Sequence, residues 1–213
     1  MIPALSFAVT GATRVEHAAV PTLAFALRVA SDAPVRSVLL DAQIRIAARR
    51  RPYSPSAHDR LFELFGPVAD WGTTLRTLLW TRTTLVVPPF EESTEVELPV
   101  TCSYDLEVAA SRYIDALEDG DVPLEFLFSG SVFYGGDDGR LQTTRISWEE
   151  EAEYRLPVSV WRDVMDHHFR GTAWIRMRKE TFDRLAAHKS RNAIATWEEA
   201  IDGLLGEAGP WTP

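Results

Sequence analysis

Cysteine is nearly absent from this sequence, since Cys102 is the only one among 213 residues. A single cysteine cannot form a disulfide within its own chain, whereas small secreted domains commonly depend on such bridges. The composition therefore excludes a disulfide-stabilised secreted scaffold, and we expect a protein of the reducing cytoplasm.

Long apolar runs are absent as well. No run approaches the ~20 residues that a helix needs to cross a bilayer. The first residues, MIPALSFAVTGATRVEH, lack the basic start and the continuous apolar segment of a signal peptide. We therefore expect no membrane insertion and a cytoplasmic location.

Positive charge is scarce. The chain has 22 Lys and Arg against 31 Asp and Glu, which gives a net charge of -9 at pH 7. Proteins that bind nucleic acids normally present a basic field to the phosphates. The charge therefore argues against nucleic acid as the main partner, and it disfavours an anionic membrane surface in the same way.

Apolar residues, in contrast, make up 46% of the chain and are spread along its length, which is enough to build one core. The first half alternates apolar and polar residues with period two, as strands with one buried face do. The turn-like Asp32-Ala33-Pro34 lies between the second and third such segments, so we expect an antiparallel meander. The apolar positions are Leu5, Phe7 and Val9, then Leu23, Phe25, Leu27 and Val29, then Val38, Leu40, Ala42, Ile44 and Ile46.

Helical signals interrupt this pattern twice. Ser56 and Asp59 resemble a helix N-cap with an acidic third position, so AHDRLFELFG is predicted to be an inserted helix that ends on Gly66. Residues 105–117 have apolar side chains at helical spacing and predict a helix at the edge of the fold. Strands are expected between these helices, at residues 74–87 and 96–100.

The clearest hairpin signal joins VPLEFLFSGSVFY to LQTTRISWEEEAEYRLPV through YGGDDGR. In the second arm, alternation predicts an apolar face that includes Ile146, Trp148 and Tyr154. Glu150 violates this pattern, and a buried Glu150 paired with an arginine is the favoured interpretation over a general acid.

Beyond Pro157 the pattern becomes helical, at residues 158–169, at TFDRLAAHKS and at residues 196–205, with a short strand expected at TAWIRMR. We expect residues 1–157 to form a β-sandwich with helical insertions, and residues 158–213 to form a mostly helical extension packed on the same core, as one domain. The predicted fold is mainly β with α: an immunoglobulin-like antiparallel β-sandwich with an inserted helix, an edge helix and a helical C-terminal cap.

The stretch VWRDVMDHHFRG raises the question of a metal site. On a helix, Asp163 and His167 share a face one turn apart, and a third ligand would have to come from Glu149, Glu151 or Glu153. The favoured alternative is a helix end that packs on the core, with the histidines in the last turn, where cations favour the helix dipole.

No catalytic residue and no cofactor signature is identified, and Cys102 is expected to be a buried apolar side chain. The candidate binding residues are the basic run Arg49, Arg50 and Arg51, which could dock an acidic partner or lie along the sheet edge, and Trp211, which lies between prolines near the end of the chain.

Read together, PTLAFALRV, VLLDAQIRI, DRLFELFG, VELPVTCSYDLEVAASRYIDALEDGDVPLEFLFSGSVFY and YRLPVSVWRDVMDHHF resemble an uncharacterised actinobacterial family, a domain of unknown function, over nearly the whole chain. That family is associated with gene clusters for nickel-iron uptake hydrogenases. The resemblance implies an accessory or assembly role, and it supplies no catalytic residue.

The leading hypothesis is a non-enzymatic accessory or protein-binding module with a protein partner, in the assembly or maturation of a larger, hydrogenase-type complex. Two alternatives stay open. One is a metal-dependent hydrolase that uses Asp163 and His167, and the other is a holdase-type chaperone with an apolar groove.

Overall fold

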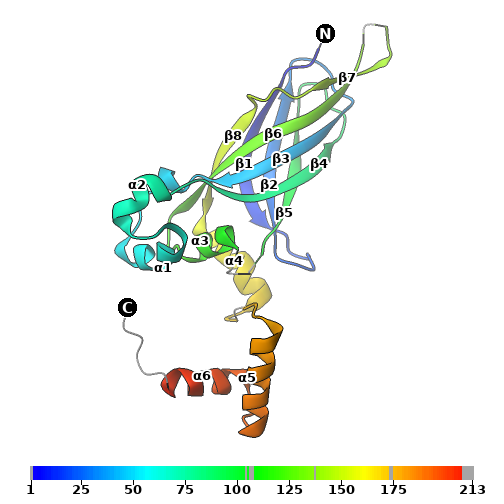
Figure 1. The fold of residues 1–213 in the computed structure, drawn as a ribbon. Helices are drawn as coiled ribbons and strands as arrows, with labels where there is room; N and C mark the ends of the chain where they lie inside the picture. The colour runs from blue at the N-terminus through cyan, green and yellow to red at the C-terminus, as the bar shows by residue number, and fades with distance from the viewer. Residues whose placement is uncertain (1, 104, 106–107, 137, 173–174, 208–213) are drawn as a thin grey trace. The chain divides into compact units, whose positions relative to one another are not determined.

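The computed structural model describes residues 2–103, 105, 108–136, 138–172 and 175–207. The chain divides into two compact units, Met1–Trp174 and Ile175–Pro213. The first unit contains all strands of the described residues, in two antiparallel sheets (Figure 1). The prediction of a mainly β chain with antiparallel sheets is therefore confirmed.

The smaller sheet has three strands in the order β1-β2-β5. They are β1 (Leu5–Arg14), β2 (Thr22–Ser31) and β5 (Ser93–Thr101). Apolar and polar residues alternate along these strands. Because successive side chains of a strand point to opposite faces, the apolar ones lie together on the core. On the central strand β2 the fully buried residues are Leu23, Phe25, Leu27 and Val29.

The larger sheet has five strands. Its order is β4-β3-β6-β7, and β8 also pairs with β6. The strands are β3 (Ser37–Ile46), β4 (Leu78–Val87), β6 (Asp121–Gly135), β7 (Leu141–Arg145) and β8 (Glu151–Pro157). The long strand β6 pairs with β7 at one end and with β8 at the other.

The predicted meander is correct for β1 and β2, which pair antiparallel, and wrong for β3. Strands β2 and β3 follow each other in sequence but belong to different sheets, because β2 pairs with β1 and β5 whereas β3 pairs with β4 and β6. The turn at Asp32-Ala33-Pro34 thus carries the chain from one sheet to the other. Period-two alternation reports which face of a strand is buried, and it does not report which strand is the hydrogen-bonded partner.

The predicted hairpin is confirmed, since β6 pairs antiparallel with β7. Its second arm is interrupted, however, by a turn in which Glu150 N–H donates to the Ser147 carbonyl at 3.2 Å. This turn removes Trp148 from the apolar face on which alternation placed it, and its side chain is 86% exposed. The extra residues of the turn shift the register, so the prediction for Trp148 is wrong.

The core lies between the two sheets. Phe25 of β2 is edge-on to Phe126 of β6, with ring centroids 5.2 Å apart, and Phe7 of β1 stacks on Phe128 of β6 at 4.3 Å. Burial of each such aromatic side chain removes a large apolar area from water, which stabilises the folded state by about 25 cal/mol per Å². These ring pairs join the two sheets.

Helices occupy the connections at one end of the sheets (Figure 1). The first, α1, begins after Ser54, whose side chain accepts a hydrogen bond from Ala57 N–H, so the cap is Ser54 and not Ser56. Pro55 at the first helical position explains the earlier start, because its fixed φ suits a helix N-terminus. The elements are η1 (Ala48–Arg50), α1 (Pro55–Phe65), η2 (Val68–Asp70), α2 (Trp71–Thr74) and α3 (Ala109–Asp115).

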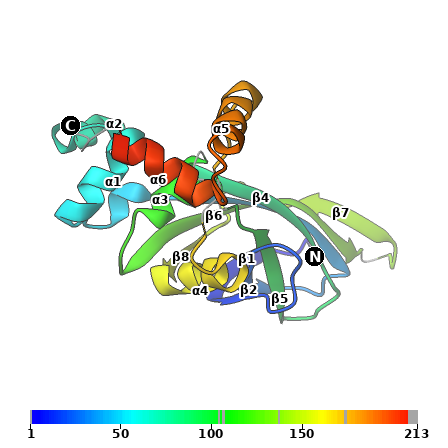
Figure 2. The same ribbon diagram turned by 90° about the horizontal axis from the view of Figure 1, so that it is seen from below.

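Helix α4 (Val158–Phe169) directly follows β8 and contacts β1, β2 and β8, and therefore strands of both sheets (Figure 2). Its buried residues are Val158, Trp161, Val164 and Met165. Trp161 is edge-on to Trp80 of β4, with centroids 5.9 Å apart. The stretch with two adjacent histidines is thus the end of a helix that packs on the core.

The second unit contains α5 (Lys179–Arg191) and α6 (Trp197–Glu207). The strand expected at TAWIRMR lies partly outside the described residues, and its residues 175–177 are not in a strand. Thr196 Oγ1 accepts a hydrogen bond from Glu199 N–H at 3.1 Å, as the capping sequence predicts. In the described part of the chain, no helix is both long and apolar enough to span a membrane.

Candidate functional site

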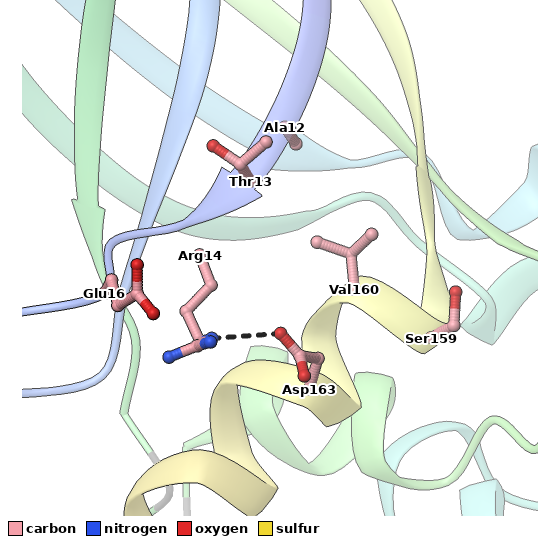
Figure 3. Close-up of a pocket in the computed structure, with 7 residues that line it drawn as sticks. All are labelled: Ala12, Thr13, Arg14, Glu16, Ser159, Val160 and Asp163. Atoms are coloured by element: carbon pink, nitrogen blue, oxygen red, sulfur yellow. Dashed lines mark hydrogen bonds and ion pairs between the residues drawn. The ribbon is translucent and has the colours of Figure 1, made fainter.

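A pocket of about 480 Å³ lies where the end of β1 meets α4 (Figure 3). Arg14, the last residue of β1, reaches toward the helix, and its Nε donates to Asp163 Oδ2 at 3.0 Å. The Asp163 side chain is 66% exposed, so this ion pair contributes less than about 1 kcal/mol to stability. The pair positions the helix against the strand.

The Arg14 guanidinium also has a buried nitrogen whose N–H groups are unused within the described part of the chain. Its Nη1 is buried and has no hydrogen-bond partner among the described residues. Glu16 and Ser159 line the same pocket. A ligand that carries a hydrogen-bond acceptor can therefore bind in the pocket, beside the Arg14 guanidinium that already pairs with the Asp163 carboxylate.

The proposed metal ligands Asp163 and His167 lie on this helix. Asp163 is held by Arg14, and His167 is exposed in the last turn. Within the residues that the structure describes, no three His, Cys, Asp or Glu side chains are grouped to hold a metal. A metal site at Asp163 and His167 stays a prediction, and it would require Asp163 to release Arg14.

The basic run lies between β3 and α1, where two of its arginines bind backbone carbonyls of the same chain. Arg49 donates to the carbonyls of Leu75 and Gly72, at 2.6 and 2.8 Å. Arg51 donates to those of Asp121 and Asp119, at 3.0 and 3.2 Å. Both arginines therefore hold the helical insertion against neighbouring segments.

Arg50 pairs with two carboxylates, with Glu125 at 3.1 Å and also with Glu153. Glu150, expected to pair with an arginine, is partly buried and forms no ion pair with any residue that the structure describes. Trp211 lies outside the described residues. A binding role for Arg49, Arg50, Arg51 and Trp211 stays a prediction.

A row of apolar side chains lies on the outer face of the larger sheet and was not predicted from the sequence; we name it the apolar stripe. It consists of Val86 on β4, Leu39 on β3, the partly buried Phe133 on β6 and Leu141 on β7, and it crosses four neighbouring strands. Val86 and Leu39 are direct cross-strand partners, 63% and 43% exposed. Leu141 is 67% exposed.

The strand register makes the stripe continuous. Leu39 is opposite Ser131, two residues before Phe133, and Phe133 is opposite Thr143, two residues after Leu141. Diagonal neighbours of this kind are within reach of one another's side chains. Leu39 lies near the start of β3, whereas η1 and α1 follow the other end of that strand.

Polar side chains border the stripe. Next to the Leu39–Val86 pair, Thr84 donates its hydroxyl to Asp41 at 2.6 Å, and Ser131 and Thr143 lie on the same face. A signal in the sequence was available, because Leu39 is apolar at an outward position of a strand that otherwise alternates. The partner strands that complete the stripe could be identified only from the sheet order.

Cys102 does not supply a nucleophile. Its side chain is buried, as expected, and burial raises the pKa of the thiol to about 12. Since the thiolate is the reactive form, this cysteine stays protonated and inert at neutral pH.

Comparisons with known proteins identify the family of this chain but no activity. No curated protein matches the sequence. Among solved structures, the chain is similar to a selenomethionine-labelled β-glucosidase from Kluyveromyces marxianus, with 10% identity and a TM-score of 0.28, over 72% of this chain and 15% of that one. A likeness this weak carries no inference about fold or activity. A match over residues 2–212 places the chain in a family of unknown function, DUF6084, and the chain belongs to that family.

Proposed function

We propose that this chain is a non-enzymatic protein-binding module that docks a partner protein on the apolar stripe. The observation that carries the proposal is the exposure of Val86, Leu39 and Leu141 on the outer face of one sheet. Scattered apolar residues are normal on a protein surface, whereas a continuous group is typical of an interaction site.

The surroundings of the stripe fit the same interpretation. Protein interfaces have an apolar centre and a polar rim that hydrogen-bonds at the edge. Here the polar residues Asp41, Thr84, Ser131 and Thr143 adjoin the apolar side chains on the same face of the sheet. The strands beneath are paired on both sides at β3 and β6, so the surface is rigid before the partner binds.

The test is affinity capture with three forms of the tagged chain: wild type, Leu39→Ser/Val86→Ser, and Leu79→Ser as a matched control. Leu79 is 55% exposed on β4, outside the stripe. We expect a stoichiometric partner to copurify with wild type and with the control and to be lost with the double variant.

Equal capture by all three forms would contradict docking on the stripe. Thermal unfolding of each form separates this result from a folding defect, because the replaced side chains are exposed and their loss should leave the melting temperature nearly unchanged.

The proposal includes an accessory role in a larger, hydrogenase-type complex of the cytoplasm, which rests on the resemblance of the sequence to an actinobacterial family. It also includes an immunoglobulin-like arrangement of strands. In support, the first, second and fifth strands form one sheet while the third, fourth and sixth share the other, as in Greek-key sandwiches.

A further inference from the structure

The second unit leaves its apolar side chains in contact with water. No residue of α5 is buried, and in α6 the described residues include one buried side chain, Ala200. Six large apolar residues of this unit are exposed: Ile175 78%, Phe182 41%, Trp197 38%, Ile201 39%, Leu204 39% and Leu205 64%, whereas Met177, Leu185 and Ile194 are partly buried.

The two helices contact each other at one place. The rings of Phe182 and Trp197 have centroids 5.3 Å apart, and Lys189 Nζ lies 5.5 Å from the centroid of Trp197. From there α5 and α6 diverge at a steep angle (Figures 1 and 2). Helices that diverge cannot cover each other's apolar faces.

On α6, Trp197, Ile201 and Leu204 follow one another at spacings of three and four residues and therefore share a face. Chains below about 40 residues rarely bury enough apolar surface to be stable alone, and association is one of the usual remedies. This face thus needs a partner surface.

The charges of the two helices identify the partner. Helix α5 carries Lys179, Arg184, Lys189 and Arg191 against two acidic residues, whereas α6 carries Glu198, Glu199 and Asp202 and no basic residue. Among the ion pairs of the described residues, none joins α5 to α6 of the same chain. Each helix therefore complements the other helix of a second copy.

We propose that the helices α5 and α6 form a self-association surface, on which α5 of one chain packs against α6 of a second copy and the reverse. The arrangement is two-fold symmetric, so it closes at a dimer. It places the apolar faces together and the lysine-bearing helix next to the acidic one in both contacts.

The sequence offers an unusually direct test, because Lys179 and Lys189 are the only lysines in the chain and both lie in α5. An equal mixture of ¹⁴N and ¹⁵N chains at about 100 μM is treated with a carbodiimide, which joins an amine to a carboxylate without a spacer. Small interfaces bind in the micromolar range, so this concentration populates the dimer. We expect mixed-isotope peptides that link a lysine of α5 to Glu198, Glu199 or Asp202.

Charge reversal supplies the second measurement. Lys179→Glu/Lys189→Glu and Glu198→Lys/Asp202→Lys should each halve the mass seen by sedimentation, from twice 23.9 kDa to the monomer. Mixing the two variants should restore the dimer, because both contacts of the mixed pair again join opposite charges. Arg14→Gln, in the first unit, is the control and should stay dimeric.

A wild-type chain that remains monomeric at 100 μM, with links only between peptides of the same isotope, would overturn the proposal. So would a dimer that neither reversal weakens. Restoration of the dimer by mixing cannot come from a simple folding defect, since a misfolded variant would not regain its partner.

Discussion

Leu39 and Val86 lie directly opposite each other on β3 and β4, and both side chains face water although their neighbours in sequence, Leu40 and Val87, are fully buried. An exposed cross-strand pair of this kind adds little to the stability of an isolated chain. We therefore interpret the pair as the centre of a docking surface.

The close approach of Gly130 to Leu39 predicts a strong effect of a single methyl group. Gly130 has φ 137°, and a Cβ there would lie 2.0 Å from the Leu39 carbonyl oxygen. We expect Gly130→Ala to lower the free energy of unfolding by about 3 kcal/mol or more, because backbone cannot move aside easily. Urea denaturation measures this.

Gly135→Ala, on the same strand, is the matched control. Nothing lies within 4 Å of its added Cβ, so the change should be under about 1 kcal/mol. Equal losses for the two variants would contradict the strand geometry described at Gly130.

The hydroxyl pair of Tyr53 and Tyr113 predicts a second stability effect. The oxygens are 2.7 Å apart, and Tyr53 donates to the Ala48 carbonyl, so Tyr113 donates to Tyr53. Tyr113→Phe removes the donor in a buried site and should cost about 1 kcal/mol. Tyr134→Phe is the control, since that hydroxyl has no hydrogen bond to the described residues, and it should cost less in the same denaturation experiment.

Cys102 predicts a dependence on alkaline pH. Burial raises the pKa of this thiol to about 12 from a reference of 9.0. Below pH 9 both the folded and the unfolded thiol are protonated, and above it the unfolded thiol ionises first, so stability falls between pH 9 and 12. Above pH 9 the denaturation midpoint should therefore fall further below its value at pH 7 in wild type than in Cys102→Ala. Parallel curves would contradict the assigned burial of the thiol.

The alternative of a metal-dependent hydrolase makes its own prediction. If Asp163 and His167 bind a divalent ion, zinc should raise the melting temperature, and Asp163→Asn and His167→Ala should each abolish the rise. The Arg14 pairing of Asp163 leads us to expect no shift in any of the three proteins.

The sequence predicts the strands with one buried face best. Leu23, Phe25 and Leu27 on β2, and Leu40 and Ile44 on β3, are buried as their alternation indicates. This success follows from burial of one face, which is a local property of a strand. Sheet membership depends on contacts between distant segments, so the change of sheet after Asp32 was not predictable from the turn.

The same reason limits prediction of the candidate site. The stripe exists because Val86, Leu39, Phe133 and Leu141 fall in register across four strands, and registers between distant segments leave no periodicity in the sequence. The prediction for Trp148 is wrong for a different reason, since the turn at Ser147–Glu150 breaks the alternation from which a buried side chain was predicted. Arg49 and Arg51 look like a surface patch in sequence, but carbonyls far along the chain accept their hydrogen bonds.

Methyl NMR of the captured complex tests docking on the stripe most directly. With Leu and Val methyl groups labelled, we predict that adding the partner shifts or broadens the signals of Leu39, Val86 and Leu141 and leaves those of Leu79 unchanged. Unchanged signals from all three stripe residues in a formed complex would contradict the account, because the partner would then bind elsewhere on the chain.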